Sequence, residues 1–308
     1  MSLNGDTPFT EDEKSQMASF FEWAVVQSDK WDPSNVSSLS NAEEFDSTTL
    51  EAYCQRYLPG MGGWLANKMT GGLLGVNASE VNALFIIDYF RSGTGLPNLA
   101  SDQKDGGQYI RNRKGMAGLL MTYNFSLCIA CELPKEAIKL SHPVSNITQS
   151  PSSNCVVSCD ASTSNFAFRA KKVIVLVPTP LYAHIAFSPS LPVAKSAAAT
   201  SSFLGYTSKS IVVYDSPWWH TCIEQDGQFS MICLMVGYAG REWSKTMFGA
   251  KGGDVPEPRK ILLQDWAKEE WIWGAPCPVL DLGQLVKGGM EVIKLPFRSL
   301  HFVATETS

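Results

Sequence analysis

The hydrophobic pattern of the chain changes once, and this change limits the folds that the chain can adopt. Up to about residue 92, apolar side chains recur at helical spacing, as in residues 50–58. From Lys139 onwards, apolar residues form short runs separated by turns. Helices followed by a separate set of strands are typical of an α+β fold, in which a mixed or antiparallel sheet is flanked by helices.

Three helices are marked by their own end signals. Thr10 and Glu13 have the spacing of a capping box, which predicts an amphipathic helix from residue 11. A second helix begins near Leu50 and stops at Pro59-Gly60. Ser79-Glu80 predicts the start of a third, which ends at Ser92-Gly93.

The stretch Gly60–Gly75 carries six glycines but does not have the pattern of a nucleotide-binding loop. No G-x-G-x-x-G follows a strand here, and no G-K-[ST] occurs. The glycines therefore predict closely packed helices and turns.

Strands are expected wherever β-branched and aromatic residues cluster. One helix rich in tryptophan is expected after them, at Ile261–Trp273. The expected strands are Val144–Thr148, Cys155–Cys159, Phe166–Arg169, Val173–Val177, Ile211–Tyr214 and Met231–Val236.

Composition excludes several classes of protein. The formal net charge of −5 gives no basic surface for nucleic acid. The longest apolar runs are too short to span a bilayer. The first residues lack the apolar core of a secretory signal, so the eight cysteines are expected to be free thiols in the cytoplasm. Cys128 and Cys131 form a CxxC without a second pair, and no metal site is expected.

The segment Lys104–Gly115, KDGGQYIRNRKG, combines a glycine turn with cationic side chains. Backbone amides and guanidinium groups brought close together suit a phosphate or a carboxylate. The alternative is a solvated basic corner of a hairpin. The residues expected to face an anion or a cofactor are Gly106, Gly107, Gln108, Arg111 and Arg113.

Five motifs, taken together, resemble the flavin-containing amine oxidases, and their monoamine oxidase branch in particular. The resemblance extends from about Glu43 to Ser308, and its motifs are SEVNALFIIDYFRSGTG, KDGGQYIRNRKG, SFLGYTSKSIVVYDSPWW, GAPCPVLDLG and FVATETS. It implies that the chain is mainly the substrate domain of that family with a remnant of its FAD-binding domain. The implied division is 1–138 (helical), 139–190 (flavin-domain remnant) and 191–308 (substrate-domain sheet and tryptophan-rich helix).

The resemblance also implies where the chain departs from the family. The family binds FAD through a glycine fingerprint at its start and a closing segment after the TET run, and the sequence shows neither. Pro276 stands where monoamine oxidases carry a tyrosine of their aromatic cage, and Ala275 stands where animal members carry the flavin-linked cysteine. We therefore expect a protein without a cofactor, and the alternative is FAD.

Lys209 matches the lysine that holds a water near the flavin in the family. On an apolar strand this lysine would be desolvated, which favours its neutral form; the alternative is an edge lysine that reaches solvent. The expected catalytic residues are Lys209, Asp88, Tyr89, His220 and Glu306. The expected walls of the substrate cavity are Met69, Leu73, Phe85, Trp266, Trp271, Trp273, Pro276 and Cys277.

Three functions remain open at this point. The favoured one is a cofactor-independent enzyme that uses an aromatic cavity for cyclisation, isomerisation or proton transfer on a small hydrophobic or aromatic metabolite. The second is a flavin-dependent amine oxidase represented by an incomplete chain. The third is a non-catalytic protein that binds a small molecule or an oxidase partner. Under all three, exposed strand edges predict a homodimer.

Overall fold

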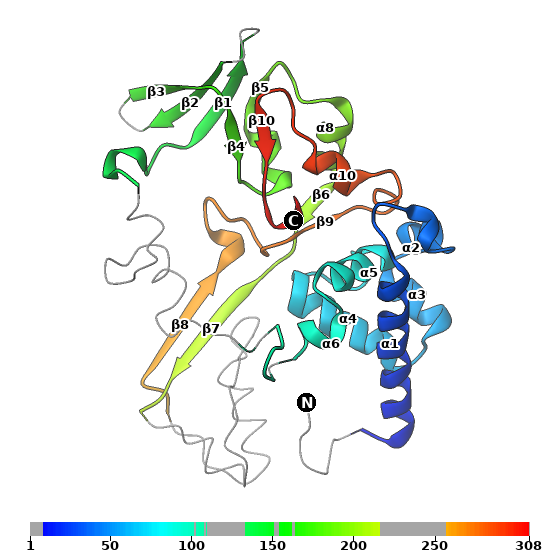
Figure 1. Ribbon diagram of the computed structural model, residues 1–308. Coiled ribbons are helices and arrows are strands. Elements are labelled where there is room, and N and C mark those ends of the chain that lie inside the picture. The colour runs from blue at the N-terminus through cyan, green and yellow to red at the C-terminus, as the bar shows by residue number, and fades with distance from the viewer. Residues whose placement is uncertain are drawn as a thin grey trace.

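The computed structural model of the chain has a helical part and a part built from small sheets (Figure 1). The residues described are 9–101, 103–107, 109, 133–150, 154–161, 164–215 and 257–307. Helices and several small sheets, mostly antiparallel, confirm the α+β class. No helix in these ranges is both long and apolar enough to cross a membrane.

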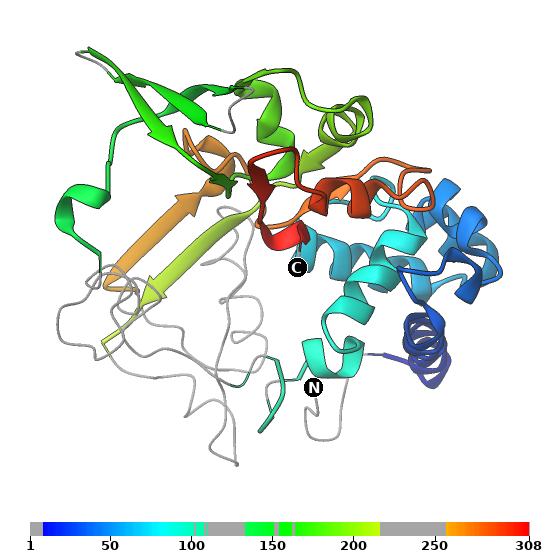
Figure 2. The same ribbon diagram turned by 45° about the horizontal axis from the view of Figure 1, so that its top comes forward.

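The helical part comes almost entirely from the first hundred residues. In Figure 2 it stands on one side of the molecule, with the C-terminal segment between it and a long two-stranded ribbon. Its α-helices are α1 (Glu11–Lys30), α2 (Ala42–Ser47), α3 (Leu50–Tyr57), α4 (Met61–Leu74), α5 (Ala83–Ser92) and α6 (Leu96–Leu99).

Local end signals predict these helices well. The capping box is present, with the Glu13 N–H donating to Thr10 Oγ1 and the Thr10 N–H donating to the Glu13 carboxylate at 2.7 Å. The end of α3 at Tyr57 also agrees with the prediction. The predicted start of the third helix is wrong by a few residues. Asn82 caps α5, its side chain accepting from the Phe85 N–H at 2.6 Å, because the residues before it pair with the α3 region instead.

The sheets are small and are joined by loops. A four-stranded sheet has the order β3-β2-β1-β5, in which β1 and β5 are parallel and the other pairs antiparallel. Its strands are β1 (Val144–Gln149), β2 (Cys155–Ala161), β3 (Ser164–Ala170) and β5 (Ala186–Ser188).

Three two-stranded pairs complete the sheets. The first, β4 with β10, is parallel, and the other two are antiparallel. The pairs are β4 (Val173–Val175) with β10 (Leu300–Phe302), β6 (Ser202–Leu204) with β9 (Pro278–Leu280), and β7 (Ser208–Val213) with β8 (Lys260–Asp265).

One predicted element is wrong in kind. The tryptophan-rich segment expected as a helix forms β8 followed by one 3-10 turn, η6 (Trp266–Lys268). Leu262 and Leu263 lie opposite Ile211 and Ser210, so pairing with β7 decides the conformation of an apolar run that fits either structure. Met231–Val236 lies outside the described residues.

Two hydrophobic cores organise the molecule, and the C-terminal third contributes to both. The first joins α1–α6 with Val279, Leu280 and Ile293. The second lies under the sheets and includes Leu300 and Phe302. The residue ranges proposed as domains are not tested by this arrangement and stay a prediction.

Three glycines allow the helical part and the sheets to touch through their backbones. Gly75 ends α4 in the left-handed conformation, at φ 68°, and its carbonyl accepts from the Tyr206 N–H at 2.8 Å. The carbonyl of Gly205 in turn accepts from the Ala275 N–H at 2.8 Å. A Cβ on Gly205 would overlap the carbonyl of Leu74, and one on Gly274 would overlap the carbonyl of Gly205. Within the glycine-rich stretch, the expected close packing is found at Gly60, Gly62 and Gly75, whereas Gly63, Gly71 and Gly72 have open space beside them.

A lysine lies buried between α8 (Val193–Thr200) and α10 (Gly289–Lys294). Lys195 is 2% exposed, and its Nζ donates to the carbonyls of Val292 at 2.8 Å and Ile293 at 2.6 Å. The same Nζ lies 4.0 Å from the centre of the Phe302 ring. Burial lowers the pKa of Lys195 to about 8, so this side chain ties the end of α10 to α8 at the cost of its own desolvation.

The glycine contact predicts that a glycine-to-alanine substitution changes stability in opposite directions at two positions. Gly205→Ala should lower the free energy of unfolding by about 3 kcal/mol, because the new Cβ meets backbone that cannot give way. Gly72→Ala, within α4 and with open space around it, should raise that free energy by about 0.5–1 kcal/mol. Urea denaturation measures both, and equal effects of the two substitutions would contradict the role assigned to Gly205.

Lys195 predicts a specific dependence of stability on pH. Its folded pKa lies below its unfolded value of 10.5, so the unfolded chain binds the proton more tightly and stability rises with pH between about 8 and 10.5. Relative to Lys195→Met, the natural protein should gain about 3 kcal/mol across that window. The exposed Lys171→Met variant serves as the control, and parallel pH curves for the natural protein and Lys195→Met would rule out this effect.

Candidate functional site

The parallel pair β4 and β10 brings together two loops from distant parts of the chain. β4 leads into η4 (Thr179–His184), and β10 leads into η7 (Thr305–Thr307). Both loops leave the carboxyl ends of their strands, the edge at which ligands bind in parallel sheets. The site is therefore built where Thr179 meets Glu306.

Glu306 is a buried carboxylate that is only half satisfied. Its Oε1 accepts from the Thr179 N–H at 2.7 Å and from Thr179 Oγ1 at 2.6 Å. Its Oε2 is also buried, and it has no hydrogen-bond partner within the residues that the structure describes. A buried acceptor in this state is available to a donor from a ligand.

Tyr182 lies one turn further along η4. Burial raises the pKa of Tyr182 to about 12, with the negative charge of Glu306 adding to the shift and the nearby Thr179 hydroxyl offsetting part of it. The Tyr182 ring packs against Phe302, with centroids 5.2 Å apart. Tyr182 therefore connects the Glu306 loop to the second hydrophobic core.

Asp88 enters the site from the C-terminal half of α5. Trp31 Nε1 donates to Asp88 Oδ1 at 2.6 Å, and Trp31 itself is buried. Burial raises the pKa of Asp88, while the Trp31 hydrogen bond and the charge of Lys294 lower it in part. Asp88 is thus a positioned carboxyl group that holds a proton more readily than an exposed aspartate.

Cys277, the residue before β9 (Pro278–Leu280), lies within electrostatic reach of both carboxyl groups. Burial raises the pKa of its thiol to about 12, and the charges of Glu306 and Asp88 add to the shift. Burial also raises the pKa of Tyr89, and Cys277 contributes to that shift. We call Asp88, Tyr89, Cys277 and Glu306 the carboxylate cluster.

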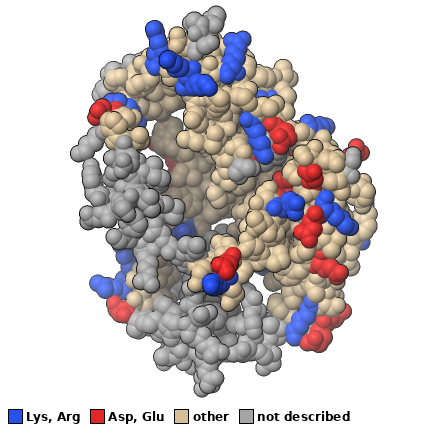
Figure 3. Space-filling model, viewed as in Figure 1, with Lys and Arg blue, Asp and Glu red and all other residues tan. Residues whose placement is uncertain are grey.

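The cluster combines residues whose sequence positions span more than two hundred residues. Three of its members were expected to be catalytic, and Cys277 was expected in the cavity wall. Two carboxyl groups and two neutral, weakly acidic side chains form a region that can attract a cation and exchange a proton with it. Figure 3 shows a hollow between the sheets and the helices, and acidic and basic side chains interspersed over the helical part.

Of the other expected catalytic and anion-facing residues, the structure describes Lys209, Gly106 and Gly107. Lys209 is exposed on β7, opposite Gln264, so the desolvated environment expected for it is absent within the described residues, and its role stays a prediction. Gly106 and Gly107 lie in the loop after α6, where the Gly107 N–H donates to the Asn98 carbonyl at 2.9 Å. The other expected positions, His220, Gln108, Arg111 and Arg113, lie outside the described residues, as do Cys128 and Cys131.

The residues expected to form the cavity wall lie in different parts of the structure and differ in burial. Phe85 is buried in the helical core, with Met69 and Leu73 packed against it. Trp266 is half-buried, whereas Pro276, Trp271 and Trp273 are exposed. Trp273 packs edge-on against His184, with centroids 4.3 Å apart, on the surface.

Sequence reasoning missed three residues that shape the site: Trp31, Thr179 and Tyr182. Thr179 and Tyr182 follow the most apolar of the predicted strands, which is the position where ligand contacts arise in parallel sheets. Nothing local identifies Trp31 as the partner of Asp88, because 57 residues separate them.

Comparison with known proteins relates the chain to flavin-containing amine oxidases. Residues 69–244, more than half of the chain, match the family model of flavin-containing amine oxidoreductases. A probable flavin-containing monoamine oxidase A from Dictyostelium discoideum is 21% identical over 90% of this chain. A putrescine oxidase from Kocuria rosea is 24% identical over 72% of it. The chain spans 65% and 52% of the lengths of these two relatives.

Solved structures show the same fold. Putrescine oxidase bound to putrescine superposes with a TM-score of 0.78 at 19% identity, over all of this chain and 73% of that one. Cyclohexylamine oxidase from Brevibacterium oxydans gives a TM-score of 0.75 at 20% identity, over all of this chain and 72% of that one. These superpositions confirm the expected amine oxidase-like fold.

The expectation of a protein without a cofactor is wrong. The matching family model describes flavin-containing enzymes, and both relatives are named as amine oxidases. The missing glycine fingerprint does not exclude FAD, because the chain spans only 65% of the length of the monoamine oxidase relative. The comparisons lend no support to cyclase or isomerase chemistry.

The Thr179 contact predicts a loss of stability when its hydroxyl is removed. Thr179→Val keeps the shape of the side chain but leaves Glu306 Oε1 with one donor, and it should lower the free energy of unfolding by about 1–3 kcal/mol. Thr179→Ser retains both donors and should lose only the contribution of a methyl group, about 1 kcal/mol. Denaturant titrations compare the two variants, and a smaller loss in Thr179→Val than in Thr179→Ser would contradict the proposed contact.

Proposed function

Because the chain belongs to the family of flavin-containing amine oxidoreductases, we propose that it acts as a flavin-dependent oxidoreductase on a small amine. The observation that carries this proposal is the half-satisfied Glu306 carboxylate at the carboxyl ends of β4 and β10. The names of the relatives support an amine as the substrate class, since they include a monoamine oxidase, putrescine oxidase and cyclohexylamine oxidase.

The residues around Glu306 fit a flavin nucleotide in part. FAD carries hydroxyl groups on its ribityl chain and its ribose, and a buried carboxylate oxygen without a partner is a suitable acceptor for such a hydroxyl. The loops at 176–179 and 303–306 leave the ends of parallel strands, where a dinucleotide lies in sheets of this kind. We therefore assign these two loops, and Glu306 in particular, to holding part of the cofactor.

When bound, the flavin would supply the redox chemistry by accepting the equivalent of a hydride from the carbon that bears the amine. The protein's own residues have the complementary tasks of binding and orienting the amine and of handling its proton. Asp88 and Glu306 provide negative charge that attracts an ammonium group. Asp88, held by Trp31 and with its pKa raised by burial, suits accepting the proton that the amine releases.

The helical core would exclude water from this region. Phe85 is buried within that core. Tyr89, which lies on the same helix as Phe85, has an aromatic ring within electrostatic reach of Cys277. Apolar walls with a few positioned polar groups are typical of sites for small ligands. The proposal assigns α5 as the wall that faces the amine.

Retention of flavin by the purified chain tests this proposal. We expect the chain to take up FAD, to keep the visible absorption band of flavin after desalting, and to lose that band when an amine such as benzylamine, cyclohexylamine or putrescine is added without oxygen. A folded chain that takes up no flavin would contradict the proposal.

A matched pair of variants tests the assignment of Glu306. Glu306→Gln replaces the carboxylate with an uncharged amide. It should weaken FAD binding at least about tenfold, as expected for the loss of a charge-assisted hydrogen bond. Glu291→Gln, at an exposed position of α10, should leave FAD binding unchanged. Quenching of flavin fluorescence measures both affinities without requiring turnover, and equal affinities would remove Glu306 from the cofactor site.

A further inference from the structure

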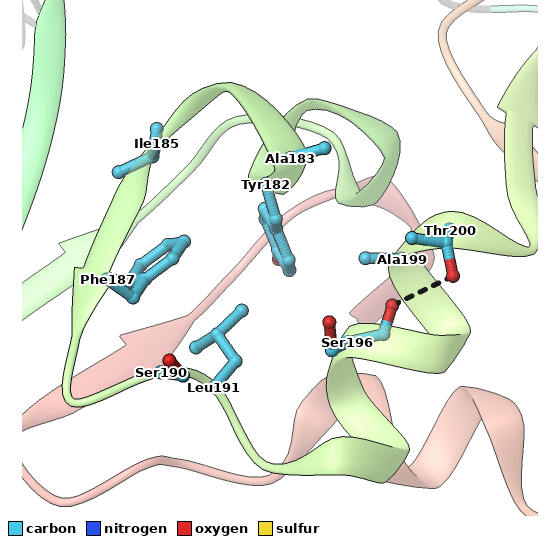
Figure 4. Close-up of a pocket in the computed structure, with 9 residues that line it drawn as sticks. All are labelled: Tyr182, Ala183, Ile185, Phe187, Ser190, Leu191, Ser196, Ala199 and Thr200. Carbon is cyan, nitrogen blue, oxygen red and sulfur yellow. Dashed lines mark hydrogen bonds between the residues drawn. The ribbon is translucent and has the colours of Figure 1, made fainter.

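A cavity of about 210 Å³ lies between η4, β5 and α8, and it shares no residue with the carboxylate cluster. Figure 4 shows its lining residues, with the Tyr182 ring among them, Phe187 and Ser190 on one side, and Ser196 and Thr200 from α8 on the other. The lining residues are Tyr182, Ala183, Ile185, Phe187, Ser190, Leu191, Ser196, Ala199 and Thr200.

Two aromatic rings form a corner of this cavity. Tyr182 and Phe187 meet edge to face, with centroids 6.4 Å apart and planes at 75°. Tyr182 is 2% exposed and is held from behind by Phe302, so its ring is a fixed wall. A third ring that enters such a corner can stack on one aromatic face and meet the other edge to face.

The polar groups of the cavity are hydroxyls without charge. Thr200 Oγ1 is occupied, since it donates to the carbonyls of Ser196 and Ala197 at 3.2 and 3.0 Å. The hydroxyls of Ser190 and Ser196 are engaged in no hydrogen bond within the described part of the chain. No Asp, Glu, Lys or Arg is found among the described residues that line the cavity, so these residues offer no charged partner for an ionised ligand.

We propose that this cavity binds a small uncharged molecule with one aromatic ring and one hydroxyl or amide substituent. The ring occupies the corner formed by Tyr182 and Phe187, and the substituent reaches the hydroxyls of Ser190 and Ser196. The size agrees with this class, since an apolar cavity of about 150 Å³ accommodates benzene. The ligand class differs from the amine substrate because the described lining of the cavity includes no carboxylate.

Ligand-observed ¹⁹F NMR with 4-fluorobenzyl alcohol tests this proposal on the whole chain. We expect a dissociation constant on the order of 1 mM, as suits a ligand of this size. Ser196→Phe fills the cavity from the exposed side of α8 and should weaken binding at least about tenfold. Ala197→Phe places the same side chain one residue further along α8, outside the lining, and should bind like the natural protein.

Further measurements exclude the alternatives. If Ser196→Phe does not fold, Ala183→Phe fills the cavity from η4 and should give the same loss. 4-Fluorobenzoate should bind at least about tenfold more weakly than the alcohol, and equal binding would overturn the uncharged class of ligand. Absence of binding to the natural protein would overturn the proposal, because the probe would then occupy no site. Binding that survives Ser196→Phe and is lost in Tyr89→Phe would also overturn it, because the probe would then occupy the carboxylate cluster.

Discussion

The backbone contact among Gly75, Gly205 and Gly274 is the constraint on which the rest of the structure depends. Three segments from different thirds of the chain approach so closely that no side chain fits between them, and two backbone hydrogen bonds join them. The contact fixes the end of α4 against the start of β7 and against the loop that leads to Cys277. Because Cys277 follows Gly274 by three residues, the same contact sets one wall of the carboxylate cluster.

The C-terminal segment joins the two hydrophobic cores and so completes the site. Asp46 in α2 accepts from the Val286 N–H at 3.0 Å, and its carbonyl accepts from the Gly283 N–H at 2.8 Å. These bonds hold the segment after β9 on the helical core, whereas β10 pairs with β4 in the other core. A site formed between two cores is a common place for ligand binding, since each core provides a wall.

Buried and half-buried ionisable groups are concentrated around this junction. Glu306, Asp88 and Lys195 lie in different elements, and each has some hydrogen bonds but no salt bridge with an oppositely charged residue among the contacts described. Burying a charge without such a partner costs stability, so arrangements of this kind are retained where they serve a function or fix a unique packing. For Lys195 the described contacts are structural, and for Glu306 the free oxygen favours a ligand.

The sequence by itself determined the features that depend on neighbouring residues. The capping box at Thr10, the end of α3 and the switch from helical to strand patterns all act within one or two turns of chain, and the five motifs were sufficient to indicate the family. The tertiary structure decided the rest. It made Lys260–Asp265 a strand because β7 lies beside it, left Lys209 and Trp271 exposed, and joined Thr179 to Glu306 across 127 residues. Such contacts depend on which distant segments pack together when the chain folds. Local propensity contains no information about that packing.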